Sequence, residues 1–236
     1  MGEQHPDYDL SYMAWHDWPA GSFLRYRQED AAYFRGETQG IPMKELRVLE
    51  IGFGNGTFLG WARDNGADVF GSEVSQEAQN RARNAKVPLL DPDLRQACSK
   101  LSGSFDLVVA FDVLEHLTAH EIADLFAKLE ALLRPGGHVI ARFPNGQSPF
   151  GRHFQNADHT HRIALSEAII SQILQGRPWQ RVSYGNAYRT KAGSLWRRTA
   201  LSLRYATRDI VELAVRSIYA LDAPLDTNVT IRLKRL

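Results

Sequence analysis

The chain has 236 residues, a formal net charge of +1, 44% hydrophobic residues and 23% charged residues. This size and balance are typical of one globular α/β domain, and no apolar run approaches the roughly 20 residues that cross a bilayer. A single cysteine, Cys98, excludes an internal disulfide and a cysteine-based metal site. The polar first residues lack the basic start and apolar stretch of a secretory signal, so we expect a cytoplasmic protein.

Residues 1–45 carry many aromatic side chains and no strand-like run. We expect a helical cap in this region, with its helix from near Gly21 to Gly36. Tyr12, Trp15 and Trp18 are candidates to wall a ligand pocket, because aromatic rings give apolar and sugar-stacking surfaces. Packing in a core is the simpler interpretation of these three side chains.

Short apolar runs alternate with helical patterns over residues 46–145. The strand-like runs are RVLEI, ADVFG, VPLL, DLVVAF and HVIAR. Such alternation predicts a parallel sheet with helices on both faces. One helix is well marked, because Thr118 and Glu121 form a capping box and the turn RPGG ends the helix after Leu133.

Residues 146–236 break this rhythm. A polar loop reaches Ile163, and it is followed by a helix (166–174), a strand (180–184), a long helical stretch (194–221) and the strand NVTIRLK. We expect the last two strands to join the sheet edge. The predicted fold is therefore a single α/β domain over residues 1–236: a doubly wound, Rossmann-like, mostly parallel seven-stranded sheet with an N-terminal helical cap and a C-terminal helical insertion.

The sharpest motif is the run LEIGFGNG, a strand that ends in a glycine-rich turn. Gly52, Gly54 and Gly56 would let a ligand lie against bare backbone at the carboxyl end of the strand. A dinucleotide fingerprint, G-x-G-x-x-G, needs its third glycine at the position of Thr57. Glu50, just before the turn, would repel a phosphate but attract a cationic amino group. The motif indicates a sulfonium cofactor rather than a dinucleotide.

Acidic residues end the next strands. Glu73 lies about 20 residues after the turn, where a carboxylate can accept both ribose hydroxyls. Asp91 or Asp93 follows the third strand and could accept from an adenine amino group, and Asp91 is preferred. The fourth strand brings three further residues to the same rim: Phe111, Asp112 and Val113.

In order and spacing, LEIGFGNG, Glu73, FDLVVAFDVLEHL and LLRPGGHVIARFPN resemble the successive motifs of class I S-adenosylmethionine-dependent methyltransferases. The resemblance covers about residues 46–145 and implies S-adenosyl-L-methionine as cofactor. It also implies a set of cofactor-binding residues: Glu50, Gly52, Phe53, Gly54, Asn55, Gly56, Glu73, Val74, Asp91, Phe111, Asp112 and Val113. The alternative is that these are only turn glycines and strand-end acids of another Rossmann-like domain.

A hydroxyl acceptor gains from a positioned base, and histidine is best matched to neutral pH. The long loop after the fifth strand carries Asp158, His159 and His161, which would serve as base, base-orienter or acceptor hydrogen bonder, or would brace the loop. His116 is a further candidate base, or the cap of a turn. We expect no metal ion, because Asp158, His159 and His161 are too few to bind one.

The loop and the chain ends also resemble a methyltransferase subgroup found with enzymes of surface-polysaccharide or O-antigen assembly. The shared features are the aromatic opening with Tyr12 and Trp15, the form GFGNG followed by Phe58-Leu59, the patterns PN-x-x-SPF and D-x-TH, and Pro224-Leu225-Asp226. This resemblance implies O-methylation of a sugar or glycan intermediate. One alternative is a small aromatic or quinone-like hydroxyl, which the DVLEHL run also resembles. Another is a non-catalytic S-adenosylmethionine-binding protein.

Nucleic acid is not an expected partner, because the chain is nearly neutral and lacks an N-P-P-[YF] motif and a catalytic Pro-Cys turn. The helical stretch over residues 194–221 has apolar residues at helical spacing and arginines largely on other faces. It would lie on anionic lipid or on a diphosphate-linked substrate, or it would pack on the domain or on a second subunit.

Overall fold

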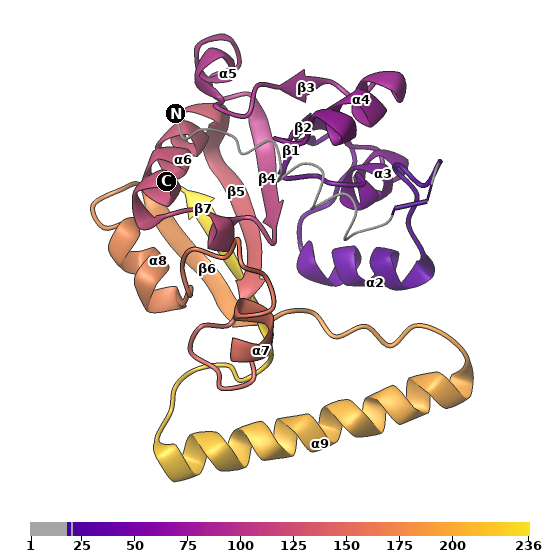
Figure 1. Cartoon of the computed structure of the whole chain (residues 1–236), viewed down its shortest axis with the longest axis vertical. Helices are drawn as coiled ribbons and strands as arrows, with labels where there is room; N and C mark the ends of the chain where they lie inside the picture. The colour runs from indigo at the N-terminus through magenta and orange to yellow at the C-terminus, as the bar shows by residue number, and fades with distance from the viewer. Residues whose placement is uncertain (1–17, 20) are drawn as a thin grey trace.

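The computed structural model describes residues 18, 19 and 21–236, so Tyr12 and Trp15 lie outside the described residues. Seven strands form one sheet in the order β3-β2-β1-β4-β5-β7-β6 (Figure 1). Their bounds are β1 Arg47–Ile51, β2 Asp68–Ser72, β3 Leu89–Leu90, β4 Phe105–Phe111, β5 Leu133–Pro144, β6 Trp179–Asn186 and β7 Asn228–Arg235. The predicted seven-stranded sheet is confirmed.

Strand direction places the functional edge of the sheet. The pairs β1–β2, β2–β3, β1–β4 and β4–β5 are parallel, whereas β7 runs antiparallel to both β5 and β6. The carboxyl ends of β1, β2 and β4 therefore meet at one rim. The strand order reverses beside β1, and in a doubly wound sheet this switch point is where ligands bind.

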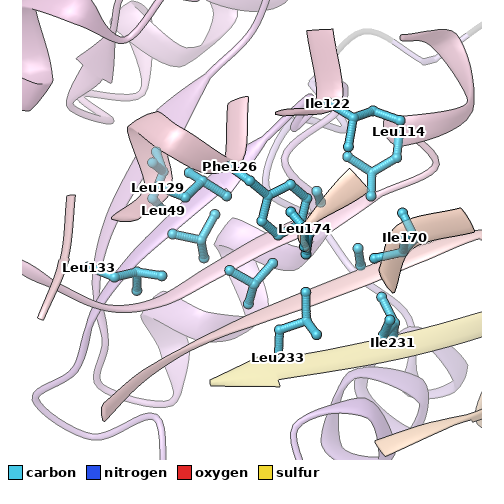
Figure 2. Close-up of a cluster of buried hydrophobic side chains, with 14 of the residues drawn as sticks. Leu49, Leu114, Ile122, Phe126, Leu129, Leu133, Ile170, Leu174, Ile231 and Leu233 are labelled. Atoms are coloured by element: carbon cyan, nitrogen blue, oxygen red, sulfur yellow. The ribbon is translucent and has the colours of Figure 1, made fainter. Parts of the chain in front are cut away.

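The central strands β1 and β4 bury both of their faces, as their apolar runs predict. Val48 and Leu107 point into one core, which α2, α3 and α4 cover, and Leu49 and Val108 point into the other. The second core lies between the sheet and helices α6 and α8. Figure 2 shows this core, in which Phe126 lies among leucine and isoleucine side chains.

Helices α6, α8 and α9 follow the expected boundaries closely. Thr118 and Glu121 form the predicted capping box of α6, and the Thr118 hydroxyl accepts from the Glu121 amide. The helix bounds are α2 Gln28–Glu37, α3 Thr57–Asp64, α4 Gln76–Asn84, α5 Arg95–Lys100, α6 Ala119–Leu132, α7 Arg152–Gln155, α8 Glu167–Ile173 and α9 Leu195–Tyr219, with a 3-10 turn, η1, at Leu114–His116. Among the described residues, no helix is both long enough and apolar enough to cross a bilayer.

The predicted start of the first helix, near Gly21, is wrong. Helix α2 begins at Gln28, because the preceding segment packs on the glycine-rich turn instead of continuing the helix. The Leu24 amide donates to the Asn55 carbonyl, and Leu24 has a positive φ of 63°. Gly60 in α3 leaves room for the Leu24 carbonyl, which a β-carbon at that position would strike. A long-range contact thus overrides local helical preference.

The loop after β5 is tied to a segment far along the chain. The buried Asn145 side chain donates to the carbonyls of Pro224 and Asp226, and the Ser148 hydroxyl donates to the carbonyl of Leu225. The PN-x-x-SPF and Pro224-Leu225-Asp226 motifs therefore contact each other. Because α9 comes between β6 and β7 in the sequence, these hydrogen bonds also fix the point at which the chain returns from α9 to the sheet.

Candidate functional site

The turn after β1 needs glycine for steric reasons. Gly52, Gly54 and Gly56 all have positive φ, at 67°, 50° and 67°. A β-carbon on Gly52 would lie 2.6 Å from Val113 Cγ2, and one on Gly54 would lie 2.8 Å from the Trp18 ring. The turn is therefore a cradle that only bare backbone can form.

Glu73 connects this turn to the end of β2. One of its carboxylate oxygens accepts from the Gly54 amide at 2.9 Å, and the other accepts from the amides of Val74 and Ser75 at 2.7 and 3.0 Å. Three backbone donors thus hold the side chain in one orientation at the rim. A carboxylate has about four acceptor positions, so Glu73 can still accept from a ligand hydroxyl.

Glu50 is the buried acid before the turn, and its Oε2 has no hydrogen-bond partner among the described residues. Burial raises the pKa of Glu50 well above its usual value, and the nearby Glu73 adds to this effect. A buried, unpaired carboxyl oxygen is costly unless a partner satisfies it. An ammonium group is such a partner, so this position fits the amino end of a methionine moiety.

A pocket of about 280 Å³ lies at the carboxyl ends of β1, β2 and β4. Its lining includes Glu73, Val74, Val113 and Leu117. Its size, its apolar walls and the carboxylate at its edge fit an adenosine group. Pro92 also lines this pocket, but Asp91 does not; the exposed Asp91 carboxylate instead accepts from the Asp93 amide at 3.0 Å. Adenine recognition by Asp91 is therefore not supported by its position.

A larger pocket of about 800 Å³ adjoins the first and shares Gly52, Asp112 and His116 with it. Trp18, one of the proposed aromatic wall residues, lines it. Besides Gly52 and Asp112, five of the residues expected to bind the cofactor lie on its wall: Glu50, Phe53, Gly54, Asn55 and Phe111. Gly56 lines neither pocket and instead serves as the N-cap of α3.

Arg142 is a site residue that the sequence patterns did not indicate. It lies on β5, its Nε donates to Asp112 at 2.9 Å, and its guanidinium lies over the rings of Tyr33 and Phe111 at 5.1 and 5.3 Å. Burial alone would lower the pKa of Arg142, but the Asp112 carboxylate raises it on balance. The negative charge of Asp112 is therefore neutralised by this ion pair.

Asp158, Thr160 and His116 form a hydrogen-bonded chain on the wall of the larger pocket. The Thr160 hydroxyl donates to Asp158 at 2.6 Å, and Thr160 Oγ1 lies 2.8 Å from His116 Nδ1. Because the hydroxyl has one proton and gives it to Asp158, its oxygen accepts from His116 Nδ1–H. His116 Nε2 then carries the lone pair of the neutral ring. Burial and the neighbouring His161 lower the pKa of His116, which keeps the ring neutral near pH 7.

The two loop histidines occupy different environments. His161 lines the larger pocket, its Nδ1 donates to the Gln155 carbonyl at 3.0 Å, and its ring centre lies 4.7 Å from that of His116. The His159 side chain is 90% exposed and lines neither pocket. A role for His159 as base is therefore not supported, because its side chain points into solvent.

Glu115 is the most buried acid of the cluster around His116. Burial and the nearby Asp112 raise the pKa of Glu115 to about 8, and its Oε2 has no partner among the described residues. One ligand atom from each of Glu115, His116 and His161 lies within 4.8 Å of the others, an arrangement in which a metal ion could be held. The predicted absence of a metal ion rests on Asp158, His159 and His161 alone. It does not take into account the grouping of Glu115 and His116 with His161.

Comparison with known proteins identifies a matching family. A family model described as "Methyltransferase domain" matches residues 23–203. Among curated proteins, the chain is 26% identical over 101 residues to the ubiquinone biosynthesis O-methyltransferase of Acinetobacter baylyi, covering 40% of this chain and 42% of the relative. It is 34% identical over 122 residues to the protein of the same name from Dinoroseobacter shibae, covering 48% and 47%. The chain spans less than half the length of these relatives.

Solved structures share the fold at low sequence identity. A methyltransferase from Archaeoglobus fulgidus, named as dependent on S-adenosylmethionine, has a TM-score of 0.60 and 18% identity, covering 86% of this chain and 88% of its own. One from Mesorhizobium loti has a TM-score of 0.55 and 18% identity, covering 86% and 95%. None of the relatives named here is described as a polysaccharide enzyme, so the resemblance to that subgroup gains no support from their names.

The raised pKa of Glu115 predicts a pH-dependent stability. Between its ordinary value of 4.5 and about 8, the carboxyl group ionises in the unfolded chain but stays protonated in the folded one, so the folded state loses stability as the pH rises. Glu115→Gln removes this loss. Denaturant unfolding at pH 5 and pH 8 should find the variant more stable than the wild type at pH 8 by at least about 1 kcal/mol, and a smaller difference at pH 5.

Glu45→Gln is the control, since it removes an acid whose side chain is 84% exposed. If wild type and Glu115→Gln lose stability in parallel between pH 5 and pH 8, Glu115 ionises normally in the folded protein and the assignment is wrong.

Proposed function

Because the chain belongs to the methyltransferase-domain family, whose model matches residues 23–203, we propose that it is an S-adenosylmethionine-dependent O-methyltransferase. We further propose a small aromatic or quinone-like hydroxyl compound as its acceptor. The observation that carries the assignment as an O-methyltransferase is the position of His116. It lines both pockets, and its Nδ1 is held by the Asp158–Thr160 chain, which leaves Nε2 free to accept a proton.

The smaller pocket would hold the adenosine part of the cofactor, with Glu73 at the ribose and Val113 and Leu117 beside the base. The methionine part would follow the glycine-rich turn toward Glu50, whose unpaired oxygen suits an ammonium group. When bound, the cofactor supplies an electrophilic methyl group on a positively charged sulfonium. The chain itself would hold both reactants in line and exclude water from them, which accounts for much of the rate in such a displacement.

His116 would act as the general base. As the acceptor hydroxyl oxygen gains the methyl group, its proton would pass to His116 Nε2, and the Asp158–Thr160 chain would stabilise the imidazolium that forms. Thr160 is a positioning residue in this scheme, because it fixes the tautomer and the ring orientation of His116 without contacting the acceptor. His161, whose ring packs against that of His116, would also border the acceptor.

The acceptor class is inferred from the carboxylates of the larger pocket. Sugar binding sites rely on carboxylates that accept from hydroxyls, but here each of these groups already accepts from a protein donor, which leaves fewer acceptor positions for a sugar: Glu29 with Arg197, Asp30 with the Arg27 amide, Asp112 with Arg142, Asp158 with Thr160, and Asp226 with Arg189 and Arg208. The two others, Glu50 and Glu115, are buried with raised pKa values. Aromatic side chains make up much of the remaining wall: Trp18, Tyr33, Phe34, Phe53, Phe58, Phe111, Phe154, Tyr188 and Tyr205.

These features favour a flat aromatic acceptor over a sugar, and the names of the curated relatives agree with that class. O-methylation of a glycan intermediate remains the second candidate, on the strength of the motif resemblance alone. A non-catalytic S-adenosylmethionine-binding protein would have no use for an open pocket of about 800 Å³ beside the cofactor site, so that alternative is disfavoured.

Glu73→Ala should weaken S-adenosylhomocysteine binding by about 1.5–3 kcal/mol, the range for hydrogen bonds to a charged group. The loss has two sources, the ribose hydrogen bond and the brace on the Gly54 amide. Isothermal titration calorimetry measures it, with Glu77→Ala as the control because Glu77 lies exposed on α4. An unchanged dissociation constant for Glu73→Ala would mean that the ribose binds elsewhere.

The acceptor class is tested with S-adenosylmethionine that carries a labelled methyl group. A catechol with a short isoprenoid tail should take up the label at its hydroxyl faster than a nucleotide-activated sugar does, because the carboxylates on the pocket wall already have protein partners. Liquid chromatography with mass spectrometry identifies the methylated atom. Transfer to the sugar alone would reject the aromatic acceptor and support the glycan alternative.

His116→Ala should lower turnover by about 100-fold or more, the contribution of a positioned base. Wild-type turnover should rise with pH along a limb whose midpoint lies below about 6.5, because the pKa of His116 is lowered. Thr160→Val should lower kcat more than it changes KM and should shift this limb, whereas Thr160→Ser should restore both. His159→Ala, at an exposed position, is the matched control and should behave as wild type.

Assays with EDTA and with added Mg²⁺ separate a base from a metal ligand at His116, given the grouping with Glu115 and His161. Full activity of His116→Ala, or wild-type activity that is lost with EDTA and restored by the metal, would contradict the role of His116 as base.

A further inference from the structure

Helix α9 leaves one complete face without a partner in the part of the chain that the structure describes. The helix spans 25 residues, contains no buried residue, and lies apart from the sheet on two extended connections (Figure 1). Its outer face is defined here by six large apolar side chains, each at least 68% exposed: Leu195, Trp196, Leu203, Ile210, Leu213 and Ile218. The residues between them on this face are small or uncharged: Thr199, Ala200, Ala206, Thr207, Ala214 and Ser217.

The opposite face of α9 holds the helix to the protein through polar contacts. Tyr205 donates to the Thr190 carbonyl at 2.9 Å, and Glu212 accepts from the side chain of Asn186 at 2.8 Å. The acidic residues of the helix, Asp209 and Glu212, both pair with Arg189. The negative charges of α9 are thus neutralised by an arginine of the same molecule.

The positive charges of α9 are only partly neutralised. Three of its five arginines pair with acids: Arg197 with Glu29, Arg208 with Asp226 and Arg216 with Asp222. Arg198 and Arg204 are exposed and have no acidic partner among the described residues. An uncharged apolar strip therefore lies beside unpaired arginines.

We propose that the outer face of α9 docks on an anionic lipid bilayer, with the helix lying in the plane of the lipid–water interface. An amphipathic helix with arginines beside a face of leucine, isoleucine and tryptophan binds such surfaces through apolar burial and attraction to acidic headgroups. The helix is about 37 Å long, enough to span a bilayer, but its charged residues exclude a spanning orientation.

A second copy of the chain fits this face less well. Two helices packed along this strip would bring two net positive helices together. They would also place Thr199, Ala206 and Ser217 at positions where a tight helix pair needs large apolar side chains. The free arginines are complementary to acidic headgroups, not to another copy of α9.

Docking would bring the acceptor pocket to the lipid surface. Tyr205 and Arg208, on the inner face of α9, line the larger pocket, so the helix forms one wall of that pocket. The entry of an acceptor with an apolar tail from the bilayer rests on the proposed function. The docking itself rests only on α9.

Co-sedimentation of the full chain with vesicles tests the docking, in the absence of cofactor and acceptor. The wild type should bind vesicles that contain phosphatidylglycerol, should bind pure phosphatidylcholine vesicles weakly, and should lose binding as salt rises. The double variant Leu203→Glu/Ile210→Glu should not bind. Arg198→Ala and Arg204→Ala should each lower the affinity about fivefold. Val182→Glu, a matched change at an exposed apolar residue of β6, should bind as wild type.

Equal binding of the wild type and the double variant, or equal binding to both vesicle types, would overturn the proposal. So would a wild type that does not bind vesicles but is a dimer in light scattering, and that becomes monomeric in the double variant. Thermal unfolding confirms that each variant is folded. Since the vesicle assay contains no reactants and the methyl-transfer assay needs no lipid, failure of the docking and failure of the proposed function give separate results.

Discussion

The site depends on one constraint: the Glu73 carboxylate accepts hydrogen bonds from three backbone amides in two different loops. It joins the glycine-rich turn after β1 to the start of the segment after β2, and so fixes the spacing between two strand ends that a ligand must bridge. Gly52 and Gly54 have to be glycine because Val113 and Trp18 occupy the space of their β-carbons. Strand order, turn and acid together give a pocket that suits an adenosine group.

The acceptor side is built differently, from residues that are distant in sequence. Asn145 and Ser148 bind the carbonyls of residues 224–226, and Arg189 binds Asp226, so the loop after β5, the segment before α9 and the segment after it close around one space. The Glu115 carbonyl accepts from the amides of Arg162 and Ile163. This contact brings Asp158 and Thr160 to His116. The same network anchors α9. This helix lines the acceptor pocket on one face and carries the proposed lipid-binding face on the other.

The glycine-rich turn after β1 and the acid at the end of β2 could be predicted from the sequence because their determinants are local, whereas the expected adenine contact, Asp91, lies outside both pockets. A strand, a glycine turn and an acid at the next strand end have fixed spacing, and the capping box of α6 is readable in four residues. The start of α2 was misplaced, because Leu24 binds Asn55 across a long separation. Arg142 and Thr160 were missed for the same reason: their partners, Asp112 and His116, are 30 and 44 residues away. For Arg142, its place at the end of a strand beside the rim was the one available signal.

The central claim is that the smaller pocket holds the adenosine part of the cofactor and the larger pocket holds its methionine part and the acceptor, with Gly52, Asp112 and His116 between them. A crystal structure of the full chain with S-adenosylhomocysteine tests it most directly. We expect adenosine in the smaller pocket, a ribose hydroxyl on Glu73, the amino group at Glu50, and the sulfur at the boundary beside His116. Adenosine bound in the larger pocket, or a ribose that does not contact Glu73, would contradict it.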